Sequence, residues 1–167
     1  MADEIKIEKI RQAFEAFENV LEPAISALDN RDKISFERAT SMDGFEPKNA
    51  RGGIGILYGG SAYEKTTRGP ALIMKRILKI NLLISAKFID NPNQRTENIS
   101  AMMPAEYVDF IIDALSGIKV FNHLPEYENK VYPVADEIVG EENNNWKYLV
   151  TMAVPVDYLE KSLRNNF

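Results

Sequence analysis

Residues 72–89, "LIMKRILKINLLISAKFI", decide the fold class, because apolar and polar side chains alternate along them with a period of two. From residue 78 onward one set of alternate positions is apolar: Leu78, Ile80, Leu82, Ile84, Ala86 and Phe88. Polar side chains fall on the opposite set, at Lys75, Lys79, Asn81, Ser85 and Lys87. This alternation predicts a half-buried strand of an antiparallel sheet.

The predicted strand is long for a chain of this size. At about 3.3 Å per residue it extends roughly 55 to 60 Å, beyond the usual strand. A short β-prone run, residues 54–58, precedes it, with the turn-rich segment "GGSAYEKTTRGP" (59–70) between them. We therefore expect residues 54–89 to form a long β-hairpin, part of which bends or projects because a small domain cannot cover it.

Two helices and a second hairpin complete the predicted order. A helical stripe of apolar residues begins the chain: Ile7, Ile10, Phe14, Phe17 and Leu21. Pro23 is expected to end or break this helix, and 24–30 to continue briefly as helix. A second stripe follows Pro104 and stops at Gly117, and contains Tyr107, Val108, Ile111, Ile112 and Leu115.

The closing hairpin is predicted from two β-prone runs, residues 130–139 and 146–156, joined by "GEENNN". Residues 31–51 lose all periodicity and predict a flexible loop, and the tail, residues 158–167, predicts one or two helical turns. The whole chain, 1–167, is interpreted as one α+β domain, an antiparallel sheet with helices packed on one face and a long projecting β-hairpin.

Composition excludes several classes of protein. The chain has 167 residues, a net charge of −5 and no cysteine, so disulfides and thiolate metal sites are absent. No apolar run is long enough to cross a membrane, and the charged N-terminus "MADEIKIEKIRQ" does not resemble a secretory signal, so we expect no membrane partner. The acidic balance also opposes tight binding to a nucleic-acid backbone.

The glycine-rich stretch "RGGIGILYGGS" (51–61) raises the question of a phosphate-binding loop. Such a loop follows a strand, precedes a helix and supplies a lysine after its last glycine. Here the glycines surround a strand, and Ser61 and Ala62 stand where Lys and Ser or Thr are required. The stretch is better interpreted as a strand whose glycines permit tight turns or close backbone approach.

Other candidate chemistries are similarly weak. Glu106, Asp109 and Asp113 share one side of the second helix, but no further ligand set accompanies them, and the acidic residues of 137–142 flank a turn. His123 is the only histidine and lacks a motif-placed partner for a hydrolytic triad. We predict no catalytic, cofactor-binding or metal-binding residues. The aromatics Tyr58, Tyr63, Trp146 and Tyr148 favour sheet or subunit packing over base stacking.

Charge is distributed unevenly along the chain. Residues 65–89 contain six basic side chains and no acidic one, whereas 126–142 contain six acidic side chains against Lys130 alone. The two blocks can attract each other as neighbouring strands of one subunit or between copies of the protein, and the sequence leaves both arrangements open.

The order of these segments resembles a known family. The helix "EKIRQAFEAFENVL", the short strand "GIGILYGGS", the long strand "KRILKINLLISAKF", the helix "AEYVDFIIDAL" and the closing "WKYLVTMAVPVDY" look like the tail terminator proteins of tailed bacteriophages, especially the Mu-like contractile-tail branch. The resemblance spans residues 5–158 and lies in the pattern of elements. It carries no catalytic residues over to this chain.

The resemblance implies a non-enzymatic virion protein. Such a protein forms a ring, expected to be hexameric, that caps the tail tube, ends its polymerisation and offers an attachment surface to the head. Its expected partners are the tail tube protein, sheath and head-completion proteins, and DNA only in passing through the lumen. Its expected locations are the host cytoplasm during assembly and then the virion tail.

Heterologous contacts close into rings, and sheet edges are suited to make them. The candidate subunit-interface residues are Tyr58, Gly59, Gly60, Arg68, Lys75, Lys79, Lys87, Asp136, Glu137 and Trp146. The hypothesis places the 54–89 hairpin against a neighbouring subunit, with its lysines near acidic residues of the closing hairpin, and the alternative is that these lysines are solvated. A small adaptor or connector of a phage-like particle is the alternative, and an anion-binding or nucleotide-binding enzyme is a third.

Overall fold

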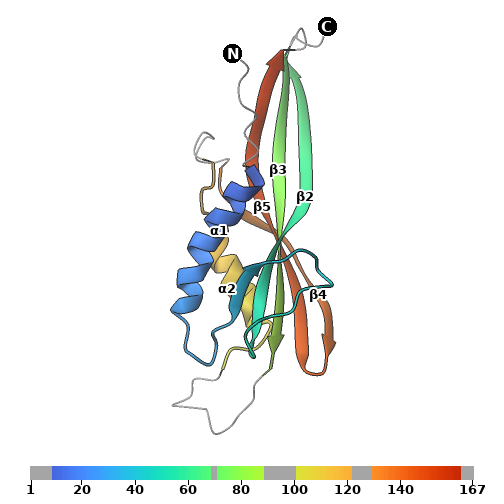
Figure 1. The fold of residues 1–167 in the computed structure, drawn as a ribbon. Helices are drawn as coiled ribbons and strands as arrows, with labels where there is room; N and C mark the ends of the chain where they lie inside the picture. Colours follow the sequence, from blue (N-terminus) through green and yellow to red (C-terminus); the bar gives the residue numbers. More distant parts are fainter. Residues whose placement is uncertain (1–8, 69–70, 89–100, 122–128, 163–167) are drawn as a thin grey trace.

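The protein is an elongated α+β structure built on one five-stranded sheet (Figure 1). The computed structural model describes residues 9–68, 71–88, 101–121 and 129–162. The elements in chain order are α1 (Lys9–Ser26), β1 (Ser35–Arg38), β2 (Gly52–Arg68), β3 (Ala71–Lys87), α2 (Glu106–Leu115), β4 (Tyr132–Glu142) and β5 (Asn145–Ser162).

The sheet is mixed, which corrects the expectation of a purely antiparallel one. Its strand order is β1-β2-β3-β5-β4, and β1 pairs with β2 in parallel, while the other neighbours are antiparallel. The four-residue strand β1 lies inside 31–51, the segment predicted to be a loop. A strand this short shows no readable periodicity, so only its pairing with Gly53–Ile56 reveals it.

The predicted 54–89 hairpin is not a free hairpin. β2 continues through the segment predicted to be turn-rich and pairs with β3 as far as Arg68 and Ala71. β5 pairs with the other side of β3 over the same length, up to Ser162. The part of the sheet beyond the helices is therefore three-stranded (Figure 1), and the helical tail predicted from residue 158 is wrong for 158–162.

Both predicted helices form, with one correction. α2 buries four of the five stripe residues, and Gly117 follows it with a φ of +84°, as predicted. α1 continues past Pro23 to Ser26. A proline removes the hydrogen bond to the residue four positions earlier. Here that loss falls in the last turn, while Leu21 and Ile25 on either side of it stay buried against the sheet.

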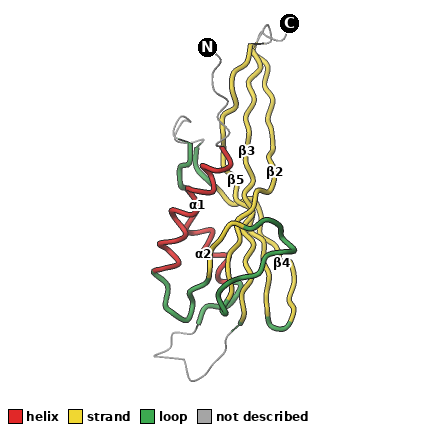
Figure 2. Tube along the Cα trace, in the orientation of Figure 1, coloured by secondary structure: helices red, strands yellow, loops and turns green. Residues whose placement is uncertain are grey.

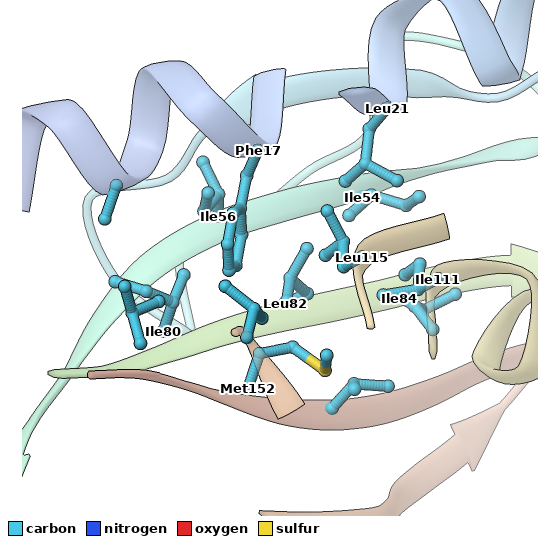
Figure 3. Packing of buried hydrophobic residues seen from close by; sticks show 14 of the residues in the cluster. Phe17, Leu21, Ile54, Ile56, Ile80, Leu82, Ile84, Ile111, Leu115 and Met152 are labelled. Atoms are coloured by element: carbon cyan, nitrogen blue, oxygen red, sulfur yellow. The ribbon is translucent and has the colours of Figure 1, made fainter. Parts of the chain in front are cut away.

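The main core lies between the two helices and one face of the sheet (Figure 3). Phe17 of α1 and Ile111 of α2 reach the alternate apolar residues of β3, including Leu82. β2 and β5 supply the neighbouring rows, represented by Ile54 and Met152. Each of these side chains is fully buried, so the period-two pattern of β3 is matched by a covered face.

The opposite face of the sheet is covered as well over its lower half. The segment 39–51 crosses it (Figure 2), and Phe45 packs there against Leu83 of β3 and Leu149 of β5. The expectation that β3 is only half-buried is therefore wrong between Leu82 and Ala86, where both faces are covered. The cover includes Phe45, from a segment without regular pattern, with Ala39 and Leu57 packed beside it.

Candidate assembly surfaces

The space beside Gly52 and Gly55 is filled by other parts of the same chain. A Cβ on Gly52 would lie 2.1 Å from the carbonyl oxygen of Ser85, and one on Gly55 would lie 2.8 Å from the ring of Phe45. These glycines let β3 and the segment 39–51 approach β2 closely. The sequence-based interpretation of a strand with close backbone contacts is confirmed.

Gly59 and Gly60 form an irregularity in β2. The register with β3 shifts between Tyr58 and Ser61, and Gly60 has a φ of +91°. Gly59 leaves room for the side chain of Asn81, which would be only 2.6 Å from a Cβ at that position. A bulge of this kind redirects the strand and the side chains beside it.

Next to this bulge lies a cluster of four side chains that we call the distal basic surface: Tyr58, Ser61, Tyr63 and Arg76. The hydroxyl of Tyr58 lies 2.5 Å from Oγ of Ser61. Arg76 donates from Nε to Ser61 (3.0 Å) and from Nη2 to the Tyr58 hydroxyl (3.1 Å), and its guanidinium lies 5.9 Å from the ring centroid of Tyr63. The arginine is thus held in one orientation before any partner arrives.

The hydrogen bonds and the positive charge in this cluster shift the pKa of Tyr58. Partial burial alone would raise the pKa of Tyr58, but the hydrogen bonds with Ser61 and Arg76 and the positive charge of Arg76 outweigh it and lower the pKa below its ordinary value. Tyr58 is nevertheless 41% exposed and Tyr63 55% exposed. The surface therefore offers two accessible aromatic rings beside a fixed cation, a composition common in interface hot spots.

The three candidate lysines of β3 are spread along the strand. Lys75 lies opposite Glu64 of β2, Lys79 opposite Ala153 of β5, and Lys87 at the far end opposite Asn145. Arg68 ends β2. These residues form a basic strand region and do not converge on one point.

The candidate acidic residues lie on a strand that does not touch β3. Asp136 and Glu137 belong to β4, and β5 separates β4 from β3 throughout. The basic and acidic blocks are therefore not neighbouring strands of one subunit. The arrangement as neighbouring strands of one subunit is therefore excluded for β3 and β4, and attraction between copies stays a hypothesis.

β4 is the outermost strand and is exposed on both faces. It contains four acidic residues and no basic one, and its exposed apolar side chains are Tyr132, Val134, Ile138 and Val139. Ile138 is 70% exposed. We call this strand the acidic edge. Irregularities at Val134 and Val139 leave Ala135–Ile138 as its longest run of regular pairing.

Trp146 lies on the helix-covered face of β5, opposite Ala86 of β3. Its ring stacks on that of Tyr148, with centroids 6.5 Å apart and an interplanar angle of 10°. Both rings are half-buried, so Trp146 contributes packing beside the acidic edge.

Sequence reasoning missed a buried polar network beneath the sheet. Arg51 is 4% exposed; it donates to the hydroxyl of Tyr107 at 3.2 Å and to the carbonyl oxygen of Met102. The Tyr107 hydroxyl donates in turn to the carbonyl oxygen of Asp32 at 2.7 Å. Burial raises the pKa of Tyr107, and the arginine only partly opposes this. The network joins the segment before β2 to the start of α2.

The remaining candidates form no site in the part of the chain that the structure describes. No group of three or more His, Asp or Glu residues is arranged there to hold a metal ion. Glu106 accepts a hydrogen bond from the backbone N–H of Met103, a capping role, and His123 lies outside the described residues. No described helix is both long and apolar enough to cross a membrane.

Comparison with known proteins adds no relative. No family model matches the chain, and no curated protein matches it. The candidate surfaces are therefore interpreted from their own geometry.

Proposed function

We propose that this protein is a structural assembly protein whose copies form a ring, expected to be hexameric, that caps a tail tube and ends its polymerisation. One observation carries the proposal: among the described strands, the sheet has two borders with no strand paired to their outer side, and the residues at these borders differ in charge. The acidic edge borders it beyond β5, and β2 from residue 57 onward borders it on the other side, next to the distal basic surface.

Two different borders favour a head-to-tail contact between copies. A contact of this kind joins unlike surfaces, so each copy keeps one of each kind free for the next, and a suitable rotation closes the series into a ring. The candidate residues Tyr58, Gly59 and Gly60, with Arg68, Lys75 and Lys79, lie on or beside one border. Asp136 and Glu137 lie on the other.

The capping role rests on the resemblance of the element order to tail terminators. A terminator must bind the last tube ring on one side and refuse a further tube subunit on the other. A closed ring of this chain would leave no strand border free to continue the tube. On this proposal the protein acts in the host cytoplasm during assembly and then in the virion tail, and contacts the tube protein, sheath and head-completion proteins, with DNA only passing through.

The two other functions have less support. A nucleotide-binding enzyme would need open space above the glycine stretch, and that space at Gly55 and Gly59 is filled by Phe45 and Asn81. A small adaptor would use the same exposed borders to bind other proteins, but it would not need the two borders to match each other.

Imaging tests the proposal. The purified full chain is examined by native mass spectrometry and negative-stain electron microscopy, alone and after mixing with assembled tail tubes from a Mu-like contractile-tail phage. The expected result is rings, with density added at one end of the tubes. Rings that never bind a tube would contradict the capping role, and a monomer at high concentration would contradict the whole proposal.

A further inference from the structure

We propose that the acidic edge of one copy docks along β2, residues 57–68, of the next copy, with Ile138 and Asp136 placed at Tyr63 and Arg76. This inference deepens the proposed ring and rests on its self-assembly, but not on the capping of a tube. It names a contact that includes Ile138, Tyr63 and Arg76, none of which belongs to the candidate interface residues predicted from the sequence.

Backbone hydrogen-bonding groups at both borders support this contact. β1 pairs with β2 only as far as Ile56, and Ala39 adds one bond to the Ile56 carbonyl oxygen. No described strand pairs with the outer side of β2 after that point or with the outer side of β4. Both borders thus present backbone donors and acceptors that a second strand satisfies.

Exposed apolar side chains at both borders also favour docking. Ile138 is 70% exposed and Val139 45%, although β-branched side chains of a sheet are usually covered. Tyr58 and Tyr63 are exposed at the other border. Docking one border on the other removes both sets from water at the same time.

The charges at the two borders differ in sign, which also favours docking. Residues 132–142 carry four acidic side chains and no basic one, whereas residues 57–80 of β2 and β3 carry five basic side chains and one acidic one. Two copies of the acidic edge would repel each other, and so would two copies of the basic border. Only the unlike pairing is favourable, which makes a second copy in head-to-tail orientation the occupant.

The bulges explain why such an edge does not pair indiscriminately. Pro133 and the irregularities at Val134 and Val139 interrupt the hydrogen-bonding register of β4, leaving four regular residues, Ala135–Ile138. A short ladder is weak alone, so the side chains around it decide the partner. The Arg76 guanidinium, which donates hydrogen bonds to Tyr58 and Ser61, places a positive charge beside this border that favours a carboxylate such as that of Asp136.

A pair of single-border variants tests the contact. Tyr63→Glu places a negative charge on the basic border, where it repels the acidic edge of a second copy, and leaves its own acidic edge intact. Ile138→Arg places a positive charge on the acidic edge, where it repels the basic border of a second copy, and leaves its own basic border intact. Both positions are exposed in strands at a border, so folding should be retained, which circular dichroism verifies. Each variant alone is expected to be monomeric in native mass spectra at concentrations where the unmodified chain assembles.

The mixture of the two variants is the decisive measurement. The intact acidic edge of Tyr63→Glu meets the intact basic border of Ile138→Arg, and the two altered borders carry opposite charges, so an equimolar mixture is expected to recover assembly with the two variants in one-to-one ratio. Arg11→Glu, a charge reversal on the exposed face of α1, is the matched control and should assemble like the unmodified chain.

Three results would overturn the inference: a mixture that stays monomeric, either variant assembling as the unmodified chain does, or the control losing assembly to the same extent. If Tyr63→Glu perturbs folding, Arg76→Gln replaces it with the same expected outcomes. Recovered assembly in the mixture, together with unmodified rings that do not bind tubes, would support this contact and reject the capping function.

Discussion

At the scale of single residues, Gly55 explains how an irregular segment covers the second face of the sheet. It lies opposite Leu83 in the register of β2 and β3, and the absent side chain leaves the space that the ring of Phe45 fills. Phe45 is 5% exposed and bridges to Leu149. One glycine and one aromatic ring thus hold the segment 39–51 against the sheet.

Replacing Gly55 with alanine should therefore destabilise the protein. The new Cβ lies 2.8 Å from the Phe45 ring and 3.0 Å from Cβ of Ala39, so the segment must shift. We expect the free energy of unfolding in urea to fall by about 1–3 kcal/mol, as for other overpacked sites.

Gly140 supplies the matched control, because a Cβ there meets nothing within 4 Å. Gly140→Ala should change the free energy of unfolding by less than about 0.5 kcal/mol or raise it slightly. In a Phe45→Ala background the cost of Gly55→Ala should largely disappear. Equal effects of the two glycine substitutions would contradict the proposed role of Gly55.

At the scale of elements, the β4–β5 hairpin depends on its turn. Glu142 pairs with Asn145, and the two residues between them, Asn143 and Asn144, have φ values of +53° and +65°. A two-residue turn with both φ values positive matches the right-handed twist of the strands. Asparagine tolerates this backbone region better than other residues with a side chain.

Asn143→Ile should loosen this hairpin, since a β-branched residue strongly disfavours a positive φ. The expected cost of about 1–2 kcal/mol corresponds to roughly five- to thirtyfold faster hydrogen exchange of the β4 amides. Asn143→Gly, which accepts the same φ, should exchange at nearly the original rate. Exchange that is unchanged in both variants would show that the turn does not limit the opening of β4.

At the scale of the whole molecule, the fold separates its charges. The acidic edge is β4, whereas the distal basic surface lies on β2 and β3, so β5 separates the two. Within one copy they cannot neutralise each other through adjacent strands. In the proposed ring, their attraction would act between copies.

Assembly should therefore weaken as salt is added. Exposed complementary charges are screened over a Debye length of about 3 Å at 1 M salt, compared with about 10 Å at 0.1 M. We expect the apparent dissociation constant between copies, from analytical ultracentrifugation, to rise roughly tenfold over that range. Assembly that strengthens with salt would instead indicate a contact governed by apolar burial alone.

The sequence by itself determined the elements with long, regular patterns. The alternation of Leu78 to Ala86 specifies the strand β3, and the stripe of Tyr107 to Leu115 specifies α2. The closing hairpin is also predicted, but its predicted link, residues 140–145, is in the structure a two-residue turn at Asn143 and Asn144. These patterns are local, because burying one face of a strand or helix requires a fixed spacing along the chain. The glycine stretch forms a strand with close backbone approach, as its glycines around a β-prone run predicted.

The order of the strands in the sheet is visible only in the folded chain. The four residues of β1 pair in parallel with β2, and residues 158–162 form a strand because they pair with β3. The same pairing placed β5 between the basic and acidic strands and left Ile138 and Tyr63 on opposite borders. Strand pairing and the cover that Phe45 supplies depend on residues far apart in the chain, so no local period encodes them.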